Sequence, residues 1–197
     1  MTAIFSTAYF PPTAYLSAIT RHRDVLIEAK ETFPKQTYRN RTEILTAGGV
    51  RTITVPVKRN NHSRTEEVTI DYSTRWNIIH IRTLTAAYSA SPYFLYYKDT
   101  LEEILMHRYD RLLELNMTIM EWLLKQYKIE CNIALTDNWN DTVADDYRNV
   151  FTPKEHYTTD DFKPYYQVFA DRLPFVPNLS ALDLLMNMGP EAKKYLL

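Results

Sequence analysis

The sequence predicts a single α/β domain over residues 1–197, with a mixed sheet and helices packed against it. Two short apolar runs, residues 3–8 and 24–29, flank a helical pattern, which indicates a parallel β-α-β unit at the start. Two alternating segments then indicate an antiparallel hairpin, and helical runs follow. The alternative is an α+β arrangement, in which the long helical run from Thr100 packs on one face of an antiparallel sheet.

The first half of the chain carries clear boundary signals. Pro11-Pro12 suits the first turn of a helix, because proline has no N–H to leave unpaired there. Residues 52–57 and 67–71 alternate apolar and polar side chains, and we expect them to pair with each other. Ser73 is expected to cap the next helix, which should stop at Ser91-Pro92.

The second half is predicted to be helical and then irregular. A helical run from Thr100 to Leu124 forms either one helix or two, with a break near residues 107–110. Residues 129–135 are expected to form a strand, residues 136–163 a long loop and residues 165–170 a last strand. Ser180 and Asp183 form a capping pattern for a final helix, which Gly189-Pro190 should end.

Composition narrows the function classes. A net charge of −1 and a pI near 6.5 argue against a general nucleic-acid binder. Three glycines cannot build the usual nucleotide-binding loops, and the five histidines lack the spacing of metal ligands, so no cofactor or metal is indicated. The single cysteine, the absence of signal-peptide features at the start and the lack of a long apolar stretch predict a cytoplasmic protein without a transmembrane segment.

Residues 36–41 (Gln-Thr-Tyr-Arg-Asn-Arg) are the most informative segment. If this segment is extended, Arg39 and Arg41 point to the same side, and their planar guanidinium groups can bind a phosphate or carboxylate. In the structural alternative, at least one arginine pairs with an acidic side chain or binds loop carbonyls. The segment therefore indicates where a site lies without naming a reaction.

The motifs together resemble the WbqC-like family of bacterial proteins. The similarity is carried by Tyr9-Phe10-Pro11, residues 36–41, residues 54–57 and the Pro-Asn-Leu-Ser block at residues 177–180, in that order. The short form resembles homologues from Bacteroides-type bacteria. Phe5-Ser6-Thr7 stands where longer members have His-Gln-Pro, and residues 137–161 lack their glycine-rich turn. If those features carry chemistry, this form has lost it or has a narrower activity.

The resemblance implies work on sugars or their carriers in surface polysaccharide biosynthesis, including O-antigen, and an acyl or aminoacyl transfer to a sugar is one idea for such proteins. The expected ligand is a small sugar-linked, phosphorylated or carboxylated molecule. A non-catalytic binding or assembly protein of the same pathway is the alternative. Fifteen tyrosines suit sugar stacking, and they equally suit a wet interface such as that of a homo-oligomer.

The candidate site residues come from these motifs and from helical spacing. His80 lies one helical turn from Trp76 and is either a general base or a satisfied core histidine. Asp183 is either a capping carboxylate or, if buried, a partner for the arginines, with Asn187 on the same helical face. The candidate catalytic residues are His80 and Asp183; the candidate ligand-binding residues are Tyr9, Tyr38, Arg39, Asn40, Arg41, Trp76, Asn178 and Asn187.

Overall fold

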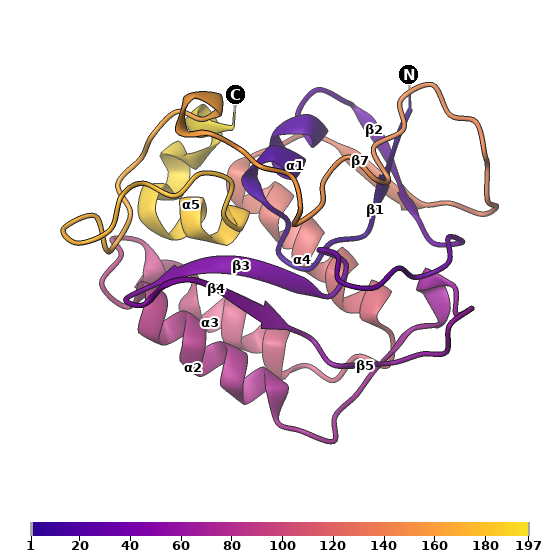
Figure 1. Ribbon diagram of the computed structural model, residues 1–197, viewed down its shortest axis with the longest axis horizontal. Helices are drawn as coiled ribbons and strands as arrows, with labels where there is room; N and C mark the ends of the chain where they lie inside the picture. Colours follow the sequence, from indigo (N-terminus) through magenta and orange to yellow (C-terminus); the bar gives the residue numbers. More distant parts are fainter. Residues whose placement is uncertain (1, 197) are drawn as a thin grey trace.

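The computed structural model, which describes residues 2–196, has a small parallel sheet at one end and a layer of helices with an antiparallel hairpin at the other (Figure 1). The parallel sheet contains β1 (Ala3–Ser6), β2 (Asp24–Glu28) and β7 (Asn132–Leu135), in the order β1-β2-β7. Helix α1 (Thr13–Ile19) connects the first two strands, which pair in parallel. This arrangement confirms the predicted α/β class and its β-α-β start.

The antiparallel hairpin consists of β3 (Arg41–Thr46) and β4 (Gly49–Thr54). The expected pairing of residues 52–57 with 67–71 is therefore wrong for most of its length. Only β5 (Val57–Lys58) pairs with β6 (Thr69–Ile70). A tight turn, helped by the positive φ of Gly49, joins β3 to β4, and such a local pairing needs little loop closure.

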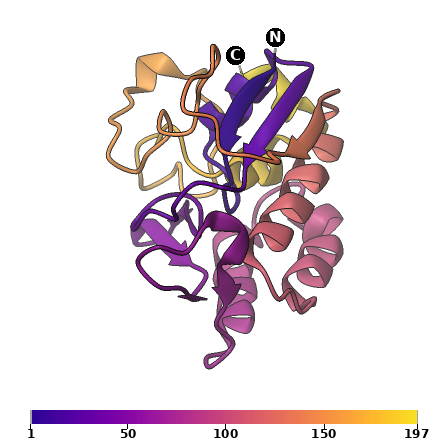
Figure 2. The same ribbon diagram turned by 90° about the vertical axis from the view of Figure 1, so that its right-hand side faces the viewer.

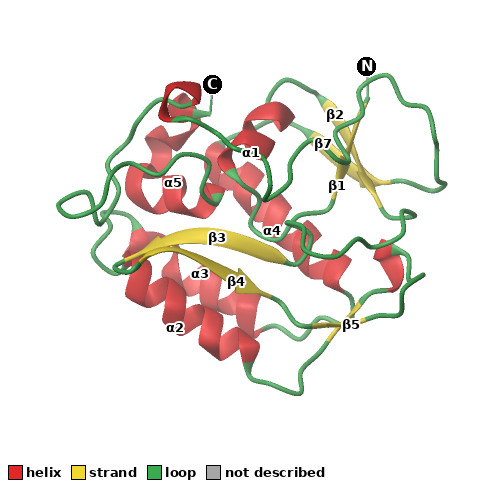
Figure 3. Ribbon diagram, viewed as in Figure 1, coloured by secondary structure: helices red, strands yellow, loops and turns green. Residues whose placement is uncertain are grey.

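Three helices occupy the middle of the chain: α2 (Trp76–Tyr88), α3 (Phe94–Met106) and α4 (Leu112–Tyr127). The predicted break near residues 107–110 separates α3 from α4, so the run is two helices. The cap expected at Ser73 is wrong, because the Ser73 backbone N–H donates to the Asp71 side chain in a turn before the helix. Helix α4 runs through the centre of the fold (Figure 3), and most of its apolar side chains are buried.

The C-terminal helix α5 (Ala181–Met188) follows the predicted signals at both ends. The Ser180 hydroxyl accepts a hydrogen bond from the Leu182 backbone N–H at 3.2 Å. Gly189 then leaves the helix with φ +53°, and a short 3-10 helix follows. A Cβ at Gly189 would lie 2.4 Å from the Tyr93 ring, so close packing also requires glycine there.

The strand expected at residues 165–170 is wrong, because this stretch is irregular. The Gln167 side chain donates to the Val176 carbonyl at 2.9 Å and accepts from the Val176 N–H at 3.0 Å. A side chain therefore makes the bonds that a neighbouring strand would make. Across residues 2–196, no helix is both long enough and apolar enough to cross a bilayer.

Candidate functional site

Buried polar groups gather where the three parallel strands end. Ser6 is the last residue of β1, Glu28 is the last of β2, and Thr136 follows β7 directly. The Glu28 side chain is fully buried, and its Oε1 accepts a hydrogen bond from the Thr136 hydroxyl at 2.7 Å. Because ligands of open α/β sheets bind outside the carboxyl ends of the strands, this edge of the sheet is a candidate binding site.

Arg39 reaches this edge from the 36–41 motif and pairs with Glu31. Its Nε and one terminal nitrogen donate to the two Glu31 carboxylate oxygens, each at 2.7 Å, and both side chains are almost completely buried. The same guanidinium also donates to the Ser6 hydroxyl. The structural alternative for the motif therefore holds at Arg39, which makes a two-point ion pair with an acidic side chain.

A second buried arginine, Arg148, comes from the acidic stretch that the sequence predicts as a loop. It binds Glu28 at 3.2 Å and Asp146 at 2.6 Å. Hydrogen bonds from Arg148 lower the pKa of the Asp146 carboxyl. Its guanidinium also lies 4.2 Å from the centre of the Trp139 ring, in cation–π contact.

A cavity of about 510 Å³, the carboxyl-edge cavity, opens beside these buried ion pairs. Figure 2 shows the three parallel strands from the side, near the N-terminus. Each buried arginine contacts one wall of the cavity, since Arg39 binds Glu31 and Arg148 stacks on Trp139. The two buried arginines thus fix a carboxylate and an aromatic ring at one opening. The lining residues are Lys30, Glu31, Thr32, Pro34, Arg64, Trp139 and Asn149.

Sequence reasoning missed Glu28, Glu31, Trp139 and Arg148. Glu28 carried a usable signal, because it lies at the end of an apolar strand in the predicted parallel unit, and ligands of open α/β sheets bind at the carboxyl ends of such strands. Trp139 and Arg148 lie in a segment without periodicity, and only the fold brings them to the cavity.

Two of the predicted residues, Trp76 and His80, line a separate groove of about 400 Å³ beside β4 and α2, and the fully buried Tyr9 contacts His80 from the core. The His80 Nδ1 is 2.8 Å from the Tyr9 hydroxyl, and the Trp76 ring packs edge-on against the imidazole. Burial lowers the pKa of His80 to about 4, against a hydrogen bond to the Thr54 backbone, so the ring is neutral at pH 7. Its catalytic role stays a prediction.

The other motif residues are distributed over the hairpin and a smaller pocket. The Asn40 side chain donates to the Val55 carbonyl at 2.9 Å, and Arg41 donates to the Gln36 carbonyl. Tyr38 and Asn178 line a pocket of about 210 Å³ together. The 36–41 segment thus separates its two arginines, and Arg39 reaches the carboxyl-edge cavity only through Glu31.

Asp183 and Asn187 lie in a third place, buried under the 165–176 segment. The expectation that a buried Asp183 would face the arginines is wrong, because its partners are neutral. The Tyr165 hydroxyl donates to its carboxylate at 2.7 Å, and the Gln167 and Asn187 amides lie at 3.4 Å. Burial raises the pKa of Asp183 to about 6, although these hydrogen bonds oppose the shift.

The raised pKa of Asp183 predicts a distinct pH dependence of stability. The carboxyl binds its proton more tightly in the folded chain, so its contribution is most favourable at low pH and is lost as the pH rises from about 4 to about 6. Asp183→Asn removes this loss. Relative to the wild type, its free energy of unfolding should increase by about 2 kcal/mol between pH 4 and pH 7.

Urea unfolding at pH 4, 5, 6 and 7 measures this difference. Asp171→Asn is the matched control, because the Asp171 side chain is 65% exposed and should give a nearly constant difference from the wild type. A constant difference for Asp183→Asn as well would show that Asp183 is ionised throughout this range.

The fold and the carboxyl-edge cavity together define an α/β protein with a charged cavity at the carboxyl ends of its parallel strands. A family model described as "WbqC-like protein family" matches residues 7–153, and the chain belongs to this family. A relative from Mycobacterium tuberculosis (strain ATCC 25618 / H37Rv), "Uncharacterized protein Rv1507c", is 28% identical over 228 residues, covering 98% of this chain and 96% of that protein. No solved structure matches the chain significantly.

Proposed function

We propose that this protein binds a sugar-linked phosphate or carboxylate in the carboxyl-edge cavity, as a step of bacterial surface polysaccharide biosynthesis. The observation that carries the proposal is that both buried arginines hold side chains of this one cavity. A buried ion pair is costly to assemble in a protein interior. Two buried arginines with such pairs place the Glu31 carboxylate and the Trp139 ring at the same opening, and this arrangement favours a preorganised binding site.

The lining groups match the parts of such a ligand. Trp139 is 47% exposed and offers its ring to the apolar face of a sugar. The Glu31 carboxylate can accept hydrogen bonds from sugar hydroxyls. Arg64 has no ion pair among residues 2–196, and its guanidinium fits a phosphate or carboxylate. Lys30 already pairs with Glu66 at 2.7 Å and contributes less free charge.

Group transfer to the bound sugar is the second candidate, and the position of Glu31 favours it. A carboxylate at the cavity wall is placed to take a proton from an attacking hydroxyl or amine of the sugar. Both of its oxygens already accept from Arg39, which favours the non-catalytic alternative in which Glu31 only orients the ligand. Product formation from a bound sugar and an acyl donor separates the two.

Ligand binding can be tested with glucose 1-phosphate, glucuronate and uncharged methyl glucoside. We expect calorimetry to show binding of both anionic sugars and at least tenfold weaker binding of the methyl glucoside. Acrylamide quenching gives a local readout, because Trp139 is exposed whereas Trp76 and Trp122 are buried. A bound sugar should therefore protect most of the quenchable fluorescence.

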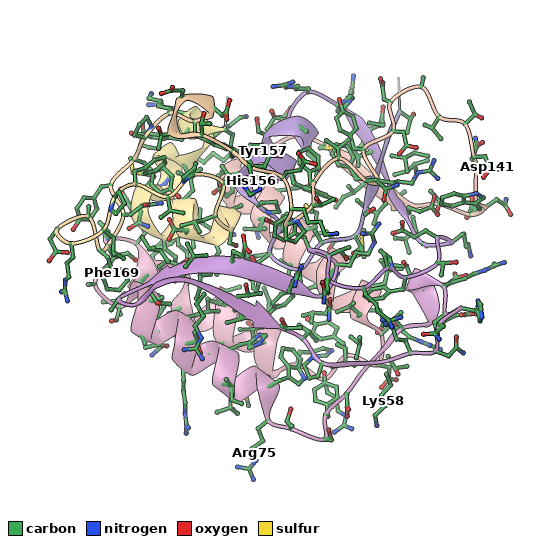
Figure 4. The ribbon with its side chains drawn as sticks, viewed as in Figure 1. Lys58, Arg75, Asp141, His156, Tyr157 and Phe169 are labelled. Carbon is green, nitrogen blue, oxygen red and sulfur yellow. The ribbon has the colours of Figure 1, made fainter. Side chains whose placement is uncertain are left out.

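Trp139→Ala and Arg64→Ala should each weaken binding at least tenfold. The matched controls are Tyr96→Ala and Arg75→Ala, both outside the cavity; Tyr96 is 76% exposed, and Figure 4 shows Arg75 projecting away from the fold. The proposal fails if none of the three sugars binds, or if the control variants weaken binding as much as the cavity variants do.

A further inference from the structure

Another cavity, of about 500 Å³, lies between α1, the loop after residue 146 and the C-terminal residues Tyr195 and Leu196. We call it the aromatic pocket. Figure 4 shows two of its residues, His156 and Tyr157, beside α1. Its size is typical of a small-molecule site. Five aromatic side chains line it: Tyr147, Phe151, Tyr157, Phe162 and Tyr195.

The aromatic lining is organised rather than scattered. The Tyr147 and Phe151 rings are parallel to within 6°, and Tyr147 stacks on the buried Phe5 ring with centroids 4.5 Å apart. Tyr157 and Phe162 meet edge to face on the loop. Tyr147, Phe151, Tyr157 and Phe162 are only partly buried, so ring surface remains available in the pocket. Such a lining favours a flat ring as the ligand.

Most polar groups of the pocket are already bonded within the protein. The Thr13 hydroxyl donates to the Leu179 carbonyl, and the Ser17 hydroxyl donates to the Leu196 carbonyl. Asp161 accepts from the backbone N–H and the hydroxyl of Thr158.

Two lining side chains carry nitrogen donors without such partners. Within residues 2–196, neither the Arg21 guanidinium nor the His156 ring makes a hydrogen bond or ion pair that satisfies it. Both can donate to an anion, whereas the carboxylate of the pocket is occupied by its own loop. The remaining polar capacity is therefore suited to a negatively charged group.

We propose that the aromatic pocket binds a nucleoside phosphate, with the base against the aromatic side chains and the phosphate on Arg21. Base–aromatic stacking tolerates any base, and a guanidinium binds phosphate through two hydrogen bonds. No glycine-rich loop is needed, because the anion contact comes from the side chains of Arg21, just after α1, and His156.

This site is distinct from the carboxyl-edge cavity, although one short segment borders both. Asn149 lines the carboxyl-edge cavity, and Arg148 stacks on its Trp139. Tyr147, Val150 and Phe151 line the aromatic pocket. The inference goes beyond the proposed sugar site and stands without it.

The test is calorimetry of the full chain with AMP, UMP, GMP and CMP, and with adenosine and inorganic phosphate as partial ligands. At least one monophosphate should bind. If it is AMP, adenosine should bind at least tenfold more weakly, and phosphate alone should show no measurable binding. Arg21→Ala should reduce the affinity for the monophosphate at least tenfold. Phe162→Ala should reduce the affinity for the monophosphate and the affinity for its nucleoside by the same factor.

Arg23→Ala is the matched control, because Arg23 is also exposed, two residues further along, and does not line the pocket. Trp139→Ala should leave nucleotide affinity unchanged. This variant therefore distinguishes failure of the sugar-site proposal from failure of the aromatic-pocket proposal. The proposal is overturned if no monophosphate binds, or if binding survives Arg21→Ala but is lost in Trp139→Ala. Thermal unfolding of each variant confirms that it is folded.

Discussion

Arg148→Met is expected to lower the free energy of unfolding by about 3–5 kcal/mol, the cost typical of breaking a buried ion pair on one side. The substitution leaves Glu28 fully buried without its cation, and it also removes the contacts to Asp146 and Trp139. Methionine keeps much of the apolar volume, so the effect reports mainly on charge. Denaturant unfolding at pH 7 measures it.

Two companion variants make this result interpretable. Arg172→Met removes an exposed arginine whose pair with Asp171 lies on the surface, and it should cost less than about 1 kcal/mol. Adding Glu28→Gln to Arg148→Met should recover part of the loss, because the unpaired charge is gone. Equal losses for Arg148→Met and Arg172→Met would mean that Glu28 is neutral or solvated in the folded protein.

Arg39→Met should be almost as damaging, again by about 3–5 kcal/mol, because it leaves the buried Glu31 carboxylate unpaired. Arg39→Lys should lie between the wild type and Arg39→Met, since an ammonium group cannot donate to both carboxylate oxygens in the same geometry. Denaturant unfolding of these variants at pH 7 measures the order.

The double variant Glu31→Leu with Arg39→Met separates stability from function. It should regain much of the lost stability, because neither charge is left alone in the interior. Under the proposed function, its affinity for glucose 1-phosphate should remain at least tenfold lower than that of the wild type, even though its stability is largely regained. A double variant as unstable as Arg39→Met alone would show that the pair serves mainly as packing.

Local signals predicted much of the fold. The parallel start, the break before α4 and the Ser180 cap of α5 all depend on residues close together in the sequence. The errors lie where a distant or competing partner decides. Residues 52–54 pair with the neighbouring strand β3 instead of the later segment, and Gln167 supplies side-chain bonds in place of a last strand.

The site was predicted less completely, for the same physical reason. The 36–41 motif led to Arg39, but its partner Glu31 had no distinguishing pattern of its own. Trp139 and Arg148 lie in a polar stretch whose composition predicts only a loop. The helical position of Asp183 was predicted correctly, but its partner was not. No rule of sequence spacing shows that Tyr165 and Gln167 pack over this side chain.

The connectivity of the parallel sheet sets the order in which the chain can fold. The side chains of Asp24 and Asn132, on neighbouring strands β2 and β7, are 108 positions apart in sequence, and the Ser180 hydroxyl bonds to the Phe10 carbonyl across 170 positions. Contacts of such long range pay loop-closure entropy before they gain any stability, whereas the β3–β4 hairpin and helices α2 to α4 form from near neighbours. During synthesis, β1 and β2 therefore leave the ribosome long before their third strand. The carboxyl-edge cavity, which needs Trp139 and Asn149, is complete only after this third strand and the loop behind it have joined the sheet.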